Sequence, residues 1–145
     1  MGCKINEMIL DDYEEVVGLW AQTEGIGLDD ADSREVMTAY LARNPGLSFV
    51  ARVEGRIVGA VLCGHEGRRG YLHHLAVARS HRGQGIGPAL VEACLSKLAS
   101  LGIAKCNIFV YADNDLGEAF WMRNGWKELR GLKVLQRDTG RSART

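Results

Sequence analysis

The sequence predicts an α/β (α+β) fold in which helices flank a mixed β-sheet. Three features support this prediction: apolar segments of strand length alternate with segments of helical periodicity, a turn joins two strand-like segments in the middle of the chain, and a glycine-rich loop connects a strand to a helix. Hairpins and strand–helix–strand units occur together in mixed sheets, whose faces are covered by helices.

Strands and helices alternate in the first half of the chain. Asp11 and Asp12 precede the first helical repeat and are good N-cap residues. Asp32 or Ser33 caps a second helix, and Pro45 lies just beyond its end. The expected elements are a strand at 5–10, a helix to about 20, a helix to about 43, and strands at 47–53, 57–64 and 71–77.

The second half continues with a helix directly after the glycine-rich loop. The expected elements are a helix at 86–101 closed by Gly102, a strand at 105–111, a helix at 119–123 and a last extended segment that ends at about 136. We expect one domain, residues 4–136. The charged tail, 137–145, is rich in small residues and is expected to be disordered. An exposed edge strand at 127–136 would allow a homodimer.

Composition excludes several classes of partner. Lys and Arg total 18 and equal Asp and Glu at 18, so no global basic field favours nucleic acid. The four cysteines lack C-x-x-C spacing, which predicts reduced thiols and no metal site. The sequence shows neither a signal-peptide pattern nor an apolar segment of about 18 residues. We therefore expect a cytoplasmic protein that has no membrane partner.

The loop at 82–87, Arg-Gly-Gln-Gly-Ile-Gly, is the most informative segment of the chain. Glycines allow the backbone to turn sharply, so that N–H groups converge on an anion at a helix N-terminus. Arg82 adds a positive charge that fits a phosphate. Pro88 and Ala89 follow the loop in place of the Lys-Ser/Thr of a Walker A motif. The loop also lies outside the first strand–helix unit, where a dinucleotide fingerprint is expected.

The pattern Arg-x-x-Gly-x-Gly resembles the coenzyme A pyrophosphate loop of the GCN5-related N-acetyltransferases (GNAT). Three blocks carry the resemblance over about residues 4–136: segment 75–81 leading into the loop, Asn114 followed by Ala119-Phe120-Trp121, and Gly125-Trp126. The resemblance implies a central splayed sheet of about six to seven strands, the acetyl-CoA N-acyltransferase fold. It also implies acetyl transfer from acetyl-CoA, as cosubstrate, to a primary amine by direct attack in a ternary complex.

The same resemblance implies a set of cofactor-binding residues. They are Leu75, Ala76 and Val77 for the pantetheine arm, Arg82, Gly83, Gln84, Gly85, Ile86 and Gly87 for the pyrophosphate, and Asn114 and Trp121 farther along. Asn114 is equally suited to cap the following helix. Core burial is the favoured alternative for Trp121. Residues 24–27 correspond to the loop that shapes the acceptor pocket in this family.

The catalytic groups depart from the family pattern. Trp121 stands where many members have a tyrosine as general acid, and Phe109 stands where some have a glutamate. Strand alternation places His73 with Tyr71, Leu75 and Val77 on one face, and His74 with Leu72 and Ala76 on the other. Because arylalkylamine-type members carry histidines on this strand, His73 is the candidate base. For His74 a structural role is favoured, and Tyr111 is a weaker candidate that would hydrogen-bond the acceptor.

The free energy needed to deprotonate an amine at pH 7 narrows the choice of acceptor. A lysine amine costs about 4 to 5 kcal/mol to deprotonate at pH 7, whereas an α-amino group costs about 1 kcal/mol. A histidine base suits the second, which favours a peptide N-terminus, an amino acid or a small amine. The alternative function is a catalytically weak acyl-CoA-binding sensor or regulatory module.

Overall fold

The computed structural model describes residues 2–141, which form two compact units divided between Phe109 and Val110. The first unit contains eight strands and α-helices: β1 (Cys3–Glu7), α1 (Tyr13–Ala21), α2 (Arg34–Arg43), β2 (Phe49–Val53), β3 (Arg56–His65), β4 (Gly70–Val77), α3 (Ile86–Ser100) and β5 (Cys106–Ile108). Short 3₁₀ turns lie at η1 (Leu10–Asp12), η2 (Asp30–Asp32) and η3 (Arg79–His81). The second unit contains α4 (Asp115–Arg123).

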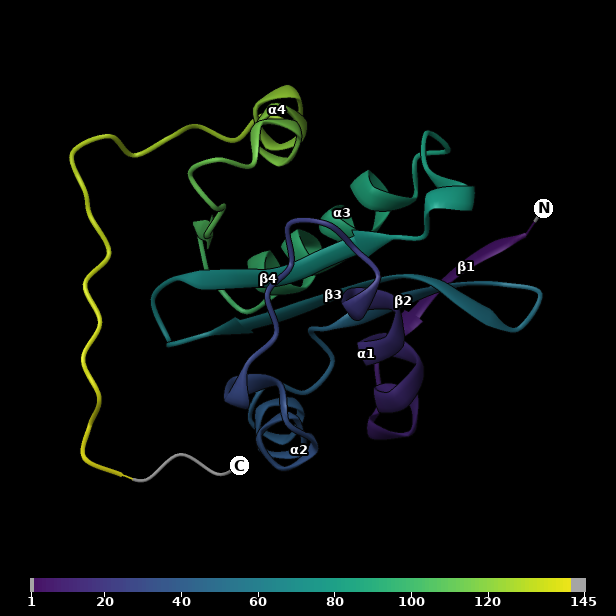
Figure 1. Ribbon diagram of the computed structural model, residues 1–145, viewed down its shortest axis with the longest axis horizontal. Coiled ribbons are helices and arrows are strands. Elements are labelled where there is room, and N and C mark those ends of the chain that lie inside the picture. The colour runs from purple at the N-terminus through teal and green to yellow at the C-terminus, as the bar shows by residue number, and fades with distance from the viewer. Residues whose placement is uncertain (1, 142–145) are drawn as a thin grey trace. The chain divides into compact units, whose positions relative to one another are not determined.

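The sheet of the first unit is mixed, as the sequence predicts. Its strand order is β1-β2-β3-β4-β5, antiparallel throughout except for the parallel β4–β5 pair (Figure 1). The α3 helix connects β4 to β5, which is the crossover that a parallel pair requires.

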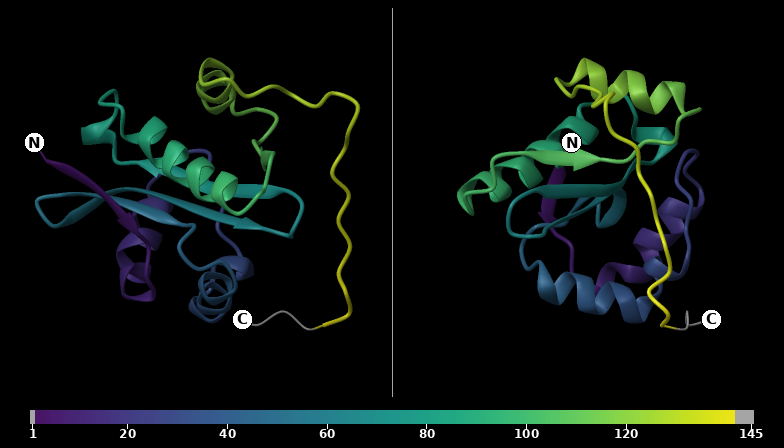
Figure 2. Two further views of the ribbon diagram at one scale, coloured as in Figure 1. Left: turned by 180° about the vertical axis from the view of Figure 1, so that it is seen from behind. Right: turned by 90° about the vertical axis from the view of Figure 1, so that its left-hand side faces the viewer.

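Helices cover both faces of this sheet. The α1 and α2 helices lie on one face and α3 lies on the other (Figures 1 and 2). The α1–α2 face buries Trp20, Met37, Ala60 and Leu62 in one apolar cluster. On the other face, α3 packs closely against β3: a Cβ added at Gly59 would lie 3.0 Å from Leu90 Cδ1.

The α2 helix begins as its sequence predicts. The Ser33 hydroxyl accepts a hydrogen bond from the Val36 N–H at 3.2 Å, which satisfies one of the free donors of the first turn. Before α1, the buried Asp12 carboxylate accepts the Ile9 N–H and pairs with Arg52 of β2. The Ser33 and Asp12 contacts therefore fix the positions at which α2 and α1 begin on this face of the sheet.

A β-bulge interrupts β4 and overturns the predicted alternation of its side chains. His73 pairs with Leu62 but Ala76 pairs with Ala60, so β4 carries one extra residue here, and His74 has a φ of +56°. His73 and His74 consequently both face the α1–α2 side, where their rings contact Tyr40 and Trp20. Val77 lies on the other face with its partner Gly59.

The predicted sheet of six to seven strands is too large for the described residues, which form five. Residues 127–136 form no strand, and Leu132 and Leu135 are exposed there. A strand needs a neighbour for its N–H and C=O groups, and residues 110–141 of the second unit provide none. The edge strand inferred for dimerisation is therefore wrong, while the homodimer itself stays a prediction.

Two further differences concern element ends. The strand expected at 105–111 is shortened to β5, and the helix expected at 119–123 begins earlier, at Asp115. The predicted tail, 137–145, extends past the described residues, of which 137–141 form no helix or strand. Within residues 2–141, no helix has the length and apolar character needed to cross a membrane.

Candidate functional site

The glycine-rich loop lies between β4 and α3 and has backbone geometry suited to binding an anion. Gly83 and Gly85 have φ values of +79° and +84°, a conformation that strains any residue with a Cβ. Gly85 is the N-cap of α3, a helix of 15 residues whose first N–H groups have no partner within the helix. These donors and the helix dipole favour a phosphate at this position.

One edge of β4 is open beside this loop. In the described part of the chain, β5 pairs with β4 only at Gly70, Tyr71 and Leu72, so residues 73–77 have no strand partner on that side. The splay predicted for the sheet is present here. Extended backbone with a free edge can hydrogen-bond an extended ligand such as a pantetheine arm. That Leu75, Ala76 and Val77 bind this arm stays a prediction.

Arg82 is held by a carboxylate. Its guanidinium donates two hydrogen bonds to Glu24, at 3.1 and 3.3 Å, and its Nε donates to the Val77 carbonyl at 2.9 Å. Arg79 adds a third contact to Glu24 at 3.2 Å. The hydrogen bond from Arg82, reinforced by the charges of both arginines, lowers the pKa of Glu24 to about 2. The side chain predicted to bind phosphate therefore contacts an anion from the α1–α2 connection.

His73, the predicted base, is half-buried among aromatic rings. Its ring centroid lies 6.5 Å from that of Tyr40 and 6.3 Å from that of Phe109. Burial lowers the pKa of His73, electrostatic interaction with neighbouring His74 lowers it further, and interaction with Asp32 opposes both effects. The ring is therefore neutral at pH 7, as a base must be. Its role as base stays a prediction.

His74 has a carboxylate partner that the sequence did not reveal. Its Nε2 lies 2.9 Å from Asp32 Oδ1, and its ring packs edge-on against Trp20 at 4.9 Å between centroids. The sequence predicts Asp32 only as a helix cap. Since 42 positions separate the pair, no local pattern brings them together.

Three predicted site residues belong to the second unit. Asn114 caps α4, because its Oδ1 accepts the Gly117 N–H at 3.0 Å, which confirms the capping interpretation. Trp121 is buried between the rings of Phe120 and Trp126, which confirms the packing interpretation. Tyr111 is exposed. Cofactor contacts of Asn114 and Trp121, and an acceptor contact of Tyr111, stay predictions.

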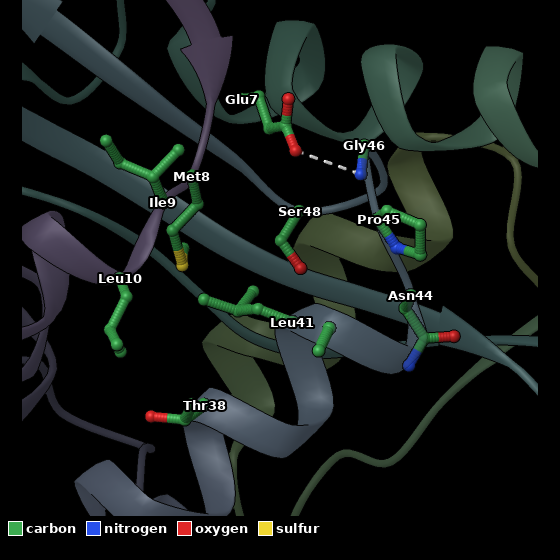
Figure 3. A pocket seen from close by; sticks show the side chains of 11 residues that line it. Glu7, Met8, Ile9, Leu10, Thr38, Leu41, Asn44, Pro45, Gly46 and Ser48 are labelled. Carbon is green, nitrogen blue, oxygen red and sulfur yellow. Dashed lines mark hydrogen bonds between the residues drawn. The ribbon is translucent and has the colours of Figure 1, made fainter.

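A separate cavity lies within the first unit. It has a volume of about 260 Å³ and lies between the end of β1, the α2 helix and the connection to β2 (Figure 3). The Glu7 carboxylate accepts the Gly46 N–H at 3.0 Å beside it. Its lining contains none of the predicted site residues, so it is not the candidate active site. Within the described residues, no group of three or more His, Cys, Asp or Glu side chains is placed to hold a metal ion.

Comparison with known proteins is consistent with this geometry. Residues 9–126 match the sequence profile described as the acetyltransferase (GNAT) family. An acetyltransferase of Sodalis glossinidius is 35% identical over 105 residues, which cover 72% of this chain and 73% of that protein. An acetyltransferase of Yersinia pseudotuberculosis is 37% identical over 105 residues, covering 72% and 74%.

Solved structures share the fold at lower identity. The PaiA N-acetyltransferase of Thermoplasma acidophilum, in complex with coenzyme A, has a TM-score of 0.78 at 19% identity, with 88% of this chain and 91% of that chain covered. The Ard1 protein of Thermoplasma volcanium has a TM-score of 0.76 at 21% identity, with 86% and 82% covered.

Proposed function

Because the chain belongs to the acetyltransferase (GNAT) family, with acetyl-CoA as cosubstrate, we propose that it transfers the acetyl group to a low-pKa primary amine. The acceptor is a peptide N-terminus, an amino acid or a small amine, which attacks the thioester directly in a ternary complex. One observation carries the proposal: the positive-φ glycine loop at the start of α3 adjoins the open edge of β4.

The loop and the strand edge have complementary tasks. The N–H groups of the loop and the Arg82 guanidinium would bind the pyrophosphate once it displaces the Glu24 carboxylate from Arg82. The free backbone groups of β4 would hold the pantetheine arm and polarise the thioester carbonyl. Binding would thus place the acetyl group beside the bulge, on whose face both histidines lie.

The choice of acceptor follows from the available base. A neutral histidine on β4 can remove a proton from an α-amino group, whose deprotonation at pH 7 costs about 1 kcal/mol. His73 is the candidate from the sequence. The departing thiol has a pKa of about 8.5, so it leaves as thiolate at a cost of about 2 kcal/mol without an acid such as the tyrosine that Trp121 replaces.

The alternative function, an acyl-CoA-binding sensor, is favoured by one observation. The rings at the two positions where relatives place proton-transferring groups, Phe109 and Trp121, carry no group that can exchange a proton at neutral pH. Such a protein would bind acetyl-CoA and release no thiol with any amine.

The deciding experiment measures free-thiol release from acetyl-CoA against peptides with free N-termini, amino acids, polyamines and arylamines. We expect release with α-amines or small amines. Turnover on internal lysine peptides alone would contradict the proposed acceptor class. Tight coenzyme A binding without thiol release for any amine in the panel would support the sensor function.

A further inference from the structure

The Asp32–His74 pair joins two parts of the chain at the bulge of β4. Asp32 comes from η2, just before α2, and His74 comes from the bulge itself. Both side chains are largely shielded, with relative exposures of 10% and 21%. Hydrogen bonds between such shielded groups, one of them ionised, are short and strong.

Asp32 is held in place by other contacts. Its Oδ2 accepts the Asp29 N–H at 3.1 Å, and its backbone carbonyl accepts the Tyr13 hydroxyl at 2.7 Å. An ionised carboxylate can only accept hydrogen bonds, so His74 Nε2 carries the proton of their contact. The remaining ring nitrogen, Nδ1, then has a free lone pair and is the basic atom of the ring.

The backbone of His74 is itself unusual. A φ of +56° is uncommon for a residue with a side chain, and here it occurs at the extra residue of the bulge. This conformation places the His74 ring on the α1–α2 face next to His73, although adjacent strand residues normally face opposite sides. The bulge therefore brings a paired histidine to the open end of β4.

The two histidines differ in the groups that their rings contact. His73 contacts the uncharged rings of Tyr40 and Phe109, and Asp32 is the weakest of the three influences on its pKa. His74 has the Asp32 carboxylate in direct contact. His73 on β4 is also close enough to interact electrostatically with His74, while α1 contributes the neutral Trp20. A base becomes a cation when it takes a proton, so a contacting counter-charge favours His74.

We propose that His74 is a catalytic residue that takes the proton of the acceptor amine at Nδ1, and that Asp32 is its positioning residue. This assignment rests on the proposed acetyl transfer. The amine nitrogen forms a bond to the acetyl carbon, the carbon–sulfur bond breaks, and the thiolate leaves. The proton lost by the nitrogen moves to Nδ1 and then to solvent, which restores the neutral ring.

The test compares three asparagine variants in steady-state thiol release with the best acceptor. Asparagine tolerates positive φ, so His74→Asn keeps the bulge but cannot accept a proton. Because a general base typically contributes about 10²- to 10⁴-fold, His74→Asn should lower kcat by about 10²-fold or more with KM for acetyl-CoA unchanged. Asp32→Asn should lower kcat less, and His73→Asn should lower it less than His74→Asn does.

Two readouts separate proton transfer from structure. The acidic limb of the kcat/KM profile should be present in the unaltered protein and in His73→Asn, and absent in His74→Asn. Glycine also adopts positive φ, and His74→Gly should regain turnover when imidazole is added, in proportion to its concentration. Loss of the acidic limb in His73→Asn but not in His74→Asn would overturn the assignment.

A measurement without turnover keeps the two proposals distinguishable. Nitrogen-15 NMR of the histidine rings should show His74 as the Nε2–H tautomer in the unaltered protein, with a changed signal in Asp32→Asn. If no amine releases thiol, the proposed acetyl transfer is wrong, and the NMR result still tests the His74–Asp32 pairing independently. A His74 ring protonated at Nδ1, or one insensitive to Asp32→Asn, would overturn the His74 assignment whatever the activity.

Discussion

Gly85 and Gly102 lie at opposite ends of α3 and share one backbone conformation. Their φ values are +84° and +82°, and a Cβ at either would meet no atom within 4 Å. Alanine at each position should therefore cost a similar free energy of unfolding, about 1 to 2 kcal/mol. Only Gly85 borders the proposed anion site, so only Gly85→Ala should weaken coenzyme A binding, by about tenfold or more, because it disturbs the loop.

Isothermal titration calorimetry of the two variants, with urea unfolding in parallel, measures both effects. Equal losses of affinity in Gly85→Ala and Gly102→Ala would show that general strain, not the loop, reduces binding. Coenzyme A binding that survives in both variants would remove the loop from the site.

The contact of Glu24 with Arg82 predicts a second effect on coenzyme A binding. Glu24 engages Arg82 and Arg79 with an ionised carboxylate, whose pKa of about 2 keeps it charged at every working pH. A phosphate that binds Arg82, as proposed, would have to displace the Glu24 carboxylate. Glu24→Gln should therefore tighten coenzyme A binding by about two- to fivefold, the range expected for an exposed ion pair.

The matched control is Glu66→Gln. Glu66 pairs with Arg68 in the exposed connection between β3 and β4, away from the glycine loop. This variant should leave coenzyme A affinity unchanged when both are measured by calorimetry at one ionic strength. Weaker binding in Glu24→Gln would mean that the carboxylate supports the site instead of competing for it.

At the scale of elements, α3 is placed by its contact with β3. A Cβ at Gly59 would lie 3.0 Å from Leu90 and 3.1 Å from Ile86, both side chains of α3. Gly59→Ala should therefore push the helix away and lower the free energy of unfolding by about 1 to 3 kcal/mol. Gly18 lies on the exposed side of α1 with nothing within 4 Å, so Gly18→Ala should raise it by about 0.5 to 1 kcal/mol.

Urea unfolding of both glycine variants gives the comparison directly. An unchanged free energy of unfolding in Gly59→Ala would show that α3 can shift on the sheet without a loss of stability. In that case the N-terminus of α3, and the anion site with it, would be less firmly positioned than the packing indicates.

The stability of the whole molecule should depend on pH through His73. Its pKa is lower in the folded protein than its usual 6.5, chiefly because of burial. The unfolded chain therefore binds more protons in the window just below about pH 6.5, so the stability present above this pH is lost as pH falls toward the folded pKa.

The free energy of unfolding should fall between about pH 7.5 and about pH 5.5, and His73→Gln should reduce this fall. Urea titrations at both pH values measure it. His81→Asn is the control, because His81 is a histidine of η3 outside the core. An unchanged pH dependence in His73→Gln would show that another group is responsible.

Whole-molecule features divide into those that local sequence determines and those that pairing determines. The glycine loop, the Ser33 cap of α2 and the three central strands β2, β3 and β4 follow from local residue preferences, and so they are predicted closely, whereas β1 and β5 lie where expected but have different ends. The segment 127–136 has strand-like residues but no neighbour in its unit, and strand formation depends on that neighbour. This is why the predicted sheet is too large.

The sequence by itself determined the fold class, the family and the position of the glycine-rich loop before α3, because glycine conformations and helix starts depend on residues a few positions apart. Only the tertiary structure decided which side chains meet. The bulge brought His73 and His74 to one face of β4, and packing of η2 on β4 joined His74 to Asp32. The α1–α2 connection likewise brought Glu24 to Arg82 across 58 positions. Such contacts depend on how distant segments pack, which no periodicity in the chain encodes.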